Sequence, residues 1–171
     1  MDISINLVAK GEKEILRNLF EKYDYEFSQY NKIDVNELGL YGYDYLDSYW
    51  NEKNRFPYFI KVDNKLAGFI MVDDYLINYL IKGLQTNWSM SNFFVMYKYR
   101  NKGIGAFCVN SMFDKHNGKW GIMYHPNNII SKNFWNKVVG EYTKGKYEII
   151  KDKKEVGYED GTMAEILVFE T

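Results

Sequence analysis

The sequence contains few of the residues that specialised folds and metal sites require. Among 171 residues it has one cysteine, Cys108, two histidines and two prolines. A single cysteine excludes an internal disulfide and any metal site built from several cysteines, and we predict no metal site. No apolar run approaches the ~18 residues of a membrane-spanning helix. The first residues lack the basic and apolar regions of a signal peptide. We therefore expect a cytoplasmic protein without a membrane partner.

The sequence also lacks a surplus of charge of either sign. The net charge is −1, so no overall attraction to nucleic acid is expected. Hydrophobic residues make up 46% and charged residues 26%, which is typical of a folded globular protein rather than a disordered one. No linker, internal repeat or low-complexity segment interrupts the chain. We therefore predict a single domain over residues 1–171, a length that suits one hydrophobic core.

The first part of the chain alternates between strand and helix patterns. Residues 3–7 alternate apolar and polar side chains as a half-buried strand does, and residues 12–30 carry apolar residues at helical spacing. A short helix is expected around residues 46–50, with Asp44 as its cap. Residues 56–62 and 66–72 are apolar runs joined by an Asp-Asn turn, which indicates a β-hairpin. We interpret residues 73–85 as a strand extension or a loose insertion.

The second part continues the same mixture. Strands are predicted at residues 89–97, 119–125, 147–150 and 163–170, and helices at residues 107–116 and 129–139, the latter capped by Asn127 or Asn128. Strands outnumber helices, and the hairpin requires antiparallel pairing. The fold class is therefore α/β with a mixed, mostly antiparallel sheet flanked by helices.

The most informative stretch is a strand, a glycine turn and a helix between Phe93 and His116. The turn contains Arg100, Gly103 and Gly105. Backbone N–H groups at a helix N-terminus are free to bind an anion, and the helix dipole favours negative charge there. Glycines let a bulky anion approach the backbone because they have no Cβ. The stretch therefore predicts a pyrophosphate site.

Two common phosphate-binding motifs do not fit this turn. A Walker A loop needs Lys-Ser or Lys-Thr after its last glycine, but Ala106 and Phe107 follow Gly105. A Rossmann fingerprint needs three glycines at its own spacing. The pattern Arg-x-x-Gly-x-Gly/Ala does match, and it resembles the acetyl-CoA-binding signature of the GNAT superfamily of N-acetyltransferases. Residues 95–100 fit the approach Val-x-Pro-x-Tyr-Arg except that Tyr97 replaces proline, and residues 128–135 are similar to the family's second motif, Asn-x-x-Ala-x-x-Phe-Tyr.

The resemblance, which covers roughly residues 69–139, implies a fold and a set of ligands. In a GNAT-like fold the fourth and fifth strands splay apart, here residues 89–97 and 119–125, and acetyl-CoA lies in the splay. The pantetheine amides would add to the exposed edge of the fourth strand. The implied acetyl-CoA-binding residues are Val95, Met96, Tyr97, Arg100, Asn101, Lys102, Gly103, Ile104, Gly105, Ala106, Asn128, Ser131 and Phe134.

Two departures from the family pattern leave the catalytic residues unknown. Trp135 stands where many members carry a tyrosine acid, and Asn92 stands where some carry a carboxylate base. Tyr97 and Tyr142 are the candidates to replace them, with Asp73 and Asp74 as further options. His125 is better explained as a hydrogen-bonded structural histidine, and Cys108 as a buried apolar residue.

The resulting hypothesis is an N-acetyltransferase that uses acetyl-CoA and acts on a primary amine, with a small cationic acceptor indicated by acids between Glu21 and Glu52. Tyr41, Tyr43, Tyr45 and Trp50 would add cation–π contacts. Basic residues dominate between Tyr97 and Lys154, which suits an anionic donor. Two alternatives remain: an acyl-CoA-binding module without turnover, and a general nucleotide-phosphate binder. The sequence leaves the acceptor and the oligomeric state, a dimer included, undetermined.

Overall fold

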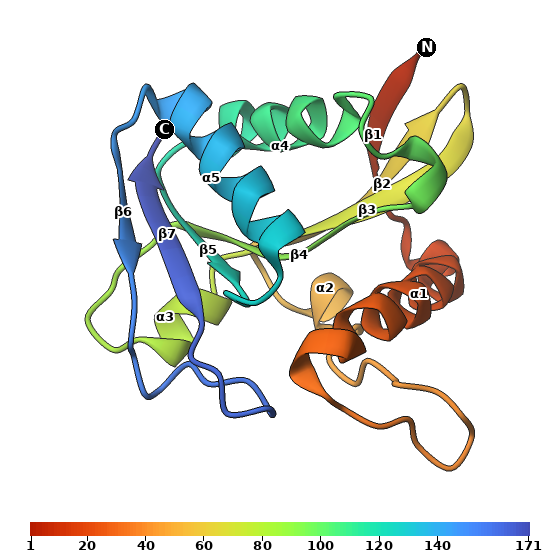
Figure 1. Ribbon diagram of the computed structural model, residues 1–171. Coiled ribbons are helices and arrows are strands. Elements are labelled where there is room, and N and C mark those ends of the chain that lie inside the picture. Colours follow the sequence, from red (N-terminus) through yellow and green to blue (C-terminus); the bar gives the residue numbers. More distant parts are fainter. The chain divides into compact units, whose positions relative to one another are not determined.

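The computed structural model describes all residues from Met1 to Thr171 (Figure 1). Seven strands form one mixed sheet in the order β1-β2-β3-β4-β5-β7-β6. The strands are β1 (Ile3–Leu7), β2 (Arg55–Val62), β3 (Lys65–Asp73), β4 (Trp88–Val95), β5 (Lys119–Tyr124), β6 (Tyr147–Ile150) and β7 (Glu165–Glu170). The α-helices are α1 (Lys13–Asn31), α2 (Ser48–Asn51), α3 (Leu76–Leu80), α4 (Ile104–Lys115) and α5 (Ile129–Thr143). The predicted α/β class with a mixed sheet and flanking helices is confirmed.

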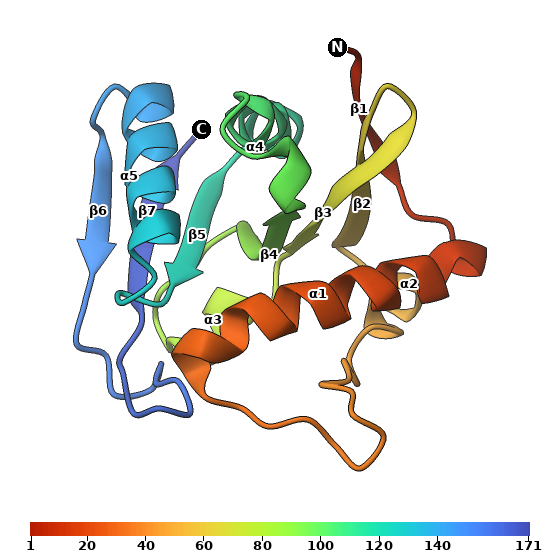
Figure 2. The same cartoon turned by 45° about the vertical axis from the view of Figure 1, so that its right-hand side comes forward.

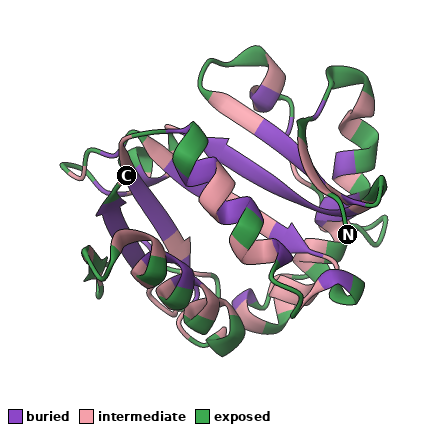
Figure 3. Cartoon of the chain, turned by 90° about the horizontal axis from the view of Figure 1, so that it is seen from above, coloured by how far each residue is buried: buried purple, intermediate pink, exposed green.

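The residues group into two compact units. Unit 1 comprises Met1–Val72 and Asn92–Gly105, and unit 2 comprises Asp73–Ser91 and Ala106–Thr171. Strand β4 therefore contributes its first half to unit 2 and its second half to unit 1. The strands are mostly buried, as the purple colouring in Figure 3 shows, whereas the helices carry exposed stripes. The single domain expected over residues 1–171 stays a prediction.

In unit 1, helices α1 and α2 cover one face of the strands. Strands β1 and β2 pair antiparallel, with Ile3 opposite Val62 and Leu7 opposite Tyr58. Asp63 and Asn64 join β2 to β3, and both have positive φ (48° and 61°). Positive φ at both central residues is the geometry of a type I′ turn, which asparagine and aspartate tolerate. The predicted hairpin and its turn are confirmed.

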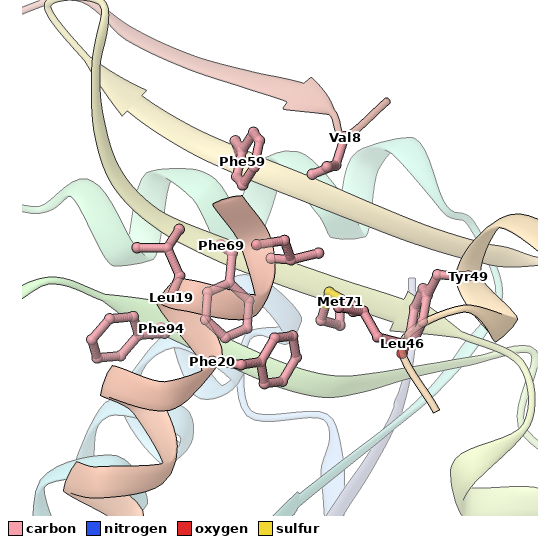
Figure 4. Close-up of a cluster of buried hydrophobic side chains, with 10 residues drawn as sticks. Val8, Leu19, Phe20, Leu46, Tyr49, Phe59, Phe69, Met71 and Phe94 are labelled. Atoms are coloured by element: carbon pink, nitrogen blue, oxygen red, sulfur yellow. The ribbon is translucent and has the colours of Figure 1, made fainter. Parts of the chain in front are cut away.

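An aromatic cluster fixes α1 on these strands (Figure 4). Phe20 of α1 lies 4.4 Å from Phe69 of β3 between ring centroids, and Tyr23 lies 6.1 Å from Phe94 of β4. Fully burying a side chain of this size contributes about 1.5–3 kcal/mol. The cluster therefore holds the helix against the strand end that leads into the glycine turn. Its members are Val8, Leu16, Leu19, Phe20, Leu46, Tyr49, Phe59, Phe69, Met71 and Phe94.

In unit 2, helices α4 and α5 cover one face of β5 and β7, and α5 runs beside these strands in Figure 2. Trp120 of β5 pairs with Phe169 of β7, and Phe113 of α4 contacts both rings, at 5.1 and 4.9 Å between centroids. The next residue along β5, Gly121, faces the other side, where a Cβ would come within 2.8 Å of Ile77 in α3. Successive residues of a strand point to opposite faces, so α3 covers the face opposite α4 and α5.

The parallel ladder between β4 and β5 is short. It consists of Trp88 opposite Trp120 and Ser89 opposite Gly121. Both pairs lie at the starts of the two strands, whereas β5 pairs with β7 along its whole length. The pairing of β4 with β5 therefore involves only the first half of β4, which belongs to unit 2.

Three local predictions were wrong. Residues 76–80 form the helix α3, because Asp73 accepts hydrogen bonds from the N–H groups of Tyr75 and Leu76 and so starts a turn. Helix α2 follows Asp47 rather than Asp44. Strand β4 ends at Val95, so Tyr97 lies in a 3₁₀ turn instead of on the strand. None of the helices has the length and apolar character needed to cross a membrane.

Candidate active site

The glycine turn connects β4 to α4 through backbone conformations that few side chains adopt. After Val95 the chain makes a 3₁₀ turn over Tyr97–Tyr99, and Asn101 and Gly103 then have φ of 59° and 75°. Helix α4 begins at Ile104, directly after Gly103. Asparagine and glycine are the residues that reach positive φ at least cost. The turn thus places the start of the twelve-residue helix α4 close to the end of β4.

The surface of this turn suits an anion. Asn101, Lys102 and Gly103 are exposed, and a Cβ built on Gly103 would meet no atom within 4 Å. Ile104 is buried and anchors the first turn of α4. The N-terminal N–H groups of a helix attract phosphate through hydrogen bonds and through the helix dipole. The residues present therefore fit the pyrophosphate of acetyl-CoA.

The side chain of Arg100 points back into unit 1 rather than serving as a free cation. Its Nε donates to the carbonyl oxygen of Val95 at 2.6 Å, and its Nη2 lies 2.6 Å from the Glu26 carboxylate in α1. The guanidinium also lies 5.5 Å from the centroid of the Phe94 ring. Arg100 therefore links the end of β4 to α1. The lysine nearest in sequence to the start of α4 is Lys102.

The last residues of β4 present alternate backbone groups to β3 and to the opposite side. The N–H of Met96 donates to the carbonyl of Ala67 in β3, so Met96 faces β3. Backbone groups of alternate residues in a strand point to opposite sides, so those of Val95 point away from β3. Arg100 already occupies the carbonyl of Val95, which leaves its N–H as the group for a pantetheine amide.

The second motif begins helix α5. The side chain of Asn128 accepts a hydrogen bond of 3.0 Å from the N–H of Ser131, which makes Asn128 the N-cap. Phe134 is half-buried, and its ring packs edge-on against Trp135 at 5.0 Å between centroids. Trp135 is buried and has no acidic proton to give a thiolate. The position of the usual tyrosine acid therefore belongs to the core in this chain.

The two tyrosines predicted to be catalytic lie in different settings. Tyr97 is 84% exposed, beside Arg100. Tyr142 donates a hydrogen bond of 2.7 Å to Asp114 at the C-terminal ends of α5 and α4. Burial, with a smaller effect of Asp114, raises the pKa of Tyr142 to about 12. Asp114 is ten residues after the start of α4, which corresponds to about 15 Å of helix. Tyr142 is therefore held by Asp114 near the far end of α4, and its catalytic role stays a prediction.

His125 is held by both ring nitrogens. Its Nδ1 accepts from the N–H of Asn127 at 3.2 Å, and its Nε2 lies 3.3 Å from the Asp160 carboxylate. The ring also lies 4.6 Å from the centroid of Tyr158. His125 thus ties the loop of residues 157–161 to the end of β5, as expected for a structural histidine. Cys108 is buried, which raises its pKa to about 12 and keeps it a thiol.

Sequence patterns did not indicate two titratable side chains of α1, Tyr23 and Asp24, whose pKa values are raised by burial. Burial raises the pKa of the Tyr23 phenol to about 12, and the side chain of Asn92 partly offsets this effect. The next residue, Asp24, is half-buried, and burial together with the negative charge of Glu21 raises its pKa to about 7. Asp24 lies four residues after Phe20 and three before Phe27, a spacing that places it beside the apolar face of α1. That spacing is the sequence signal that could have identified it.

Four of the eight acids between Glu21 and Glu52 are used within the fold. Glu21 accepts from the N–H groups of Tyr41 and Gly42 at 2.9 and 3.0 Å, and Glu26 binds Arg100. Asp47 binds Lys13 and Glu52 binds Arg55, both at 2.8 Å. Of the four aromatic residues predicted to contact a cation, Tyr43 stacks on Phe20, Trp50 donates to the carbonyl of Val8, and Tyr41 donates to Ser28. Tyr45 remains, 77% exposed.

Several solved structures share this fold. An acetyltransferase from Thermus thermophilus superposes with a TM-score of 0.71 at 11% identity, over 100% of this chain and 98% of that one. A spermidine N-acetyltransferase from Vibrio cholerae, solved with CoA and spermine, gives 0.64 at 10% identity, over 98% and 95%. A putative streptothricin acetyltransferase from Bacillus anthracis, in complex with acetyl coenzyme A, gives 0.53 at 19% identity, over 73% and 67%. At these identities the likeness shows the fold.

The amino-acid sequence identifies the family independently of the fold. A search of curated proteins finds no match. The sequence model of the acetyltransferase (GNAT) family matches residues 15–140, which include most of α1, the hairpin, the glycine turn and most of α5. This match spans well over half of the chain, and it agrees with the signature at Arg100–Gly105 and with the mixed sheet. The chain therefore belongs to the acetyltransferase (GNAT) family, whose members are N-acetyltransferases.

Proposed function

We propose that this protein transfers the acetyl group of acetyl-CoA to the primary amine of a small cationic acceptor. The proposal of an acetyl-CoA site rests on one observation. The exposed start of α4 follows a turn with positive φ at Asn101 and Gly103. The pyrophosphate would bind the N–H groups of this turn, and the pantetheine would follow the outer edge of β4 at Val95. In this proposal Arg100 positions the turn. The remaining donor residues are Met96, Tyr97, Lys102, Ile104, Gly105, Ala106, Asn128, Ser131 and Phe134.

The proposed acceptor site rests on the carboxylates that are not engaged by the hydrogen bonds and ion pairs described above. They are the half-buried Asp24 and the exposed Asp34, Glu37 and Asp44, in α1 and the segment that follows it. Carboxylates in one region attract a polycation over several ångströms and raise its local concentration. The spermidine N-acetyltransferase with a similar fold makes spermidine a suitable probe, although the likeness by itself supports only the fold.

A second candidate function is acyl-CoA binding without turnover. It is favoured by the burial of Trp135 at the usual acid position and by the uncharged Asn92 at the usual base position. Proximity of donor and acceptor alone can supply several kcal/mol of rate enhancement, so these replacements do not exclude catalysis. Release of free CoA in the presence of amines separates the two functions.

Acetyl-CoA is expected to stabilise the protein against heat. A ligand that binds only the native state adds about 2.7 kcal/mol at a hundredfold excess over its dissociation constant. For a chain of this size that corresponds to a rise in Tm of about 5–10 °C. Differential scanning fluorimetry with acetyl-CoA, CoA and ATP measures it. An equal shift with ATP would indicate a general nucleotide-phosphate binder, and no shift with any of them would contradict the donor site.

Spermidine is expected to be a better acceptor than a monoamine or an amine that carries a carboxylate. Its KM should rise when the salt concentration increases from about 50 mM to about 300 mM, because long-range attraction is screened. The kinetics are compared with those of the triple variant Asp34→Asn, Glu37→Gln, Asp44→Asn, which removes three exposed charges. Equal kcat/KM for all amines, independent of salt and of the variant, would show that these acids are only a solvated surface.

A further inference from the structure

The side chain of Arg100 is held at three points, all of them in unit 1. Its Nε donates to the carbonyl of Val95 at 2.6 Å, its Nη2 lies 2.6 Å from the Glu26 carboxylate, and its guanidinium lies 5.5 Å from the centroid of the Phe94 ring. Val95 and Phe94 end the strand that precedes the turn, whereas Glu26 belongs to α1, 74 residues away along the chain. The contact with Glu26 is therefore the one that connects the glycine turn to another element.

Helix α1 gives Glu26 a fixed place beside the end of β4. Tyr23 lies three residues earlier on the helix, and its ring lies 6.1 Å from that of Phe94, which Figure 4 shows against α1. Residues three apart share one side of a helix, so Glu26 lies on the side that faces the strand end. The side chains of Arg100 and Glu26 are 32% and 42% exposed. Because the pair is partly buried, salt screens it less than it screens an ion pair in open solvent.

Arg100 also helps to shape the backbone of the turn. Its N–H donates to the carbonyl of Tyr97 at 3.2 Å, which closes the 3₁₀ turn. The next residue is Asn101, and Asn101 and Gly103 have the positive φ that leads into α4. Without the carboxylate of Glu26, the guanidinium would keep only uncharged partners, and its long side chain would regain rotamer freedom. The start of the glycine turn would then be held less firmly.

We infer that Glu26 is a positioning residue for acetyl-CoA, acting through Arg100 to hold the glycine turn in the conformation that binds the pyrophosphate. This inference rests on the proposed acetyl-CoA site. A site that is ordered before binding loses less entropy when its ligand arrives, so its affinity is higher. The carboxylate also keeps the guanidinium directed toward Val95 and α1, so the phosphates are bound by backbone N–H groups rather than by Arg100.

The test compares acetyl-CoA binding by the wild type, Glu26→Gln and Glu14→Gln in isothermal titration calorimetry. In Glu26→Gln the Kd should rise about fivefold, because a partly exposed ion pair supplies a modest ordering of the turn. Glu14→Gln is the matched control: it lies on the same helix, also pairs with an arginine, Arg17, at 3.2 Å, and should bind as the wild type does. Both variants should keep Tm within about 4 °C of the wild type.

A double-mutant cycle and a kinetic measurement separate action through Arg100 from a general defect. If Glu26 acts through Arg100, the double variant Glu26→Gln, Arg100→Gln should bind acetyl-CoA as Arg100→Gln alone does. With spermidine as the acceptor, Glu26→Gln should raise the KM for acetyl-CoA about fivefold and keep kcat within about twofold, as loss of uniform binding requires. A variant that is merely less well folded has fewer active molecules, which lowers kcat and leaves KM unchanged.

The outcomes distinguish the role of Glu26 from the proposed function. Wild-type affinity in Glu26→Gln, or a double variant that binds more weakly than Arg100→Gln, would overturn the inference and leave the acetyl-CoA site in place. Tighter binding by Glu26→Gln would also overturn it, because the released guanidinium would then contact the phosphates. Weaker binding with a decrease in Tm beyond about 4 °C would assign Glu26 a structural role instead. Absence of acetyl-CoA binding by the wild type would refute the site and the role of Glu26 together.

Discussion

Acetyl-CoA should no longer stabilise the protein when Gly105 is replaced by aspartate. Gly105 is the second residue of α4 and is not among the glycines with positive φ. The new carboxylate would lie at the helix N-terminus, where it occupies the N–H groups that the pyrophosphate needs. Like charges at ~4 Å repel by about 4 kcal/mol at an effective dielectric constant near 20, which lowers affinity by about a thousandfold. Isothermal titration calorimetry and the thermal shift measure the loss.

The fold of Gly105→Asp should be preserved, because acidic residues are favourable in the first turn of a helix. The matched control is Gly105→Asn, which has the same size without the charge and should bind acetyl-CoA more tightly than the aspartate variant. Equal acetyl-CoA affinity of the aspartate variant and the wild type would mean that the start of α4 is not the phosphate site. In that event the match to the family signature would carry no information about the donor.

Replacing Gly68 with alanine should destabilise unit 1 by about 3 kcal/mol, at the upper end of the usual cost of overpacking. Gly68 is buried in β3, and a Cβ on it would overlap the carbonyl oxygen of Phe94 and lie 3.0 Å from Cα of Val95. Neither group is the end of a flexible side chain, so the backbone of β4 would have to move. The expected decrease in Tm is about 6–12 °C. Thermal unfolding followed by circular dichroism measures it.

Gly68→Ala should also weaken acetyl-CoA binding, because the displaced residues lead directly into the glycine turn. Gly11→Ala provides the control, since a Cβ on Gly11 would meet no atom within 4 Å. Where the backbone is compatible, replacing glycine by alanine is neutral or slightly stabilising. A Gly68→Ala variant as stable as Gly11→Ala would show that β3 and β4 are further apart than the structure indicates.

Local patterns were sufficient for most of the fold. The alternation in residues 3–7 and the Asp-Asn pair at 63–64 predicted β1 and the hairpin because side-chain period and turn conformation depend on neighbouring residues. Helix α3 was missed because Tyr75 and Tyr79 mask the spacing of Ile77, Leu80 and Ile81. The hydrogen bonds that Asp73 accepts at the start of this helix connect residues two and three apart, so the position of Asp73 is a local signal for it.

The candidate site was less predictable because its contacts are distant in sequence. The glycine turn follows from a motif of six residues, but Arg100 and Glu26 are 74 residues apart and their ion pair has no local signal. The proton affinity of Asp24 depends on burial by the fold and on the orientation of Glu21, which the segment at Tyr41 and Gly42 fixes. Such effects require the assembled tertiary structure, and sequence spacing gives only the side of the helix on which Asp24 lies.

The ion pair of Arg100 with Glu26 changes how much a signature match can say about activity. The arginine that defines the motif holds a strand end to a helix through Val95 and Glu26. Its presence is therefore evidence that the turn is built correctly, and it would remain so in a member that had lost its enzymatic activity. In this chain, the arginine of the signature therefore reports how the turn is held rather than which groups act on a substrate.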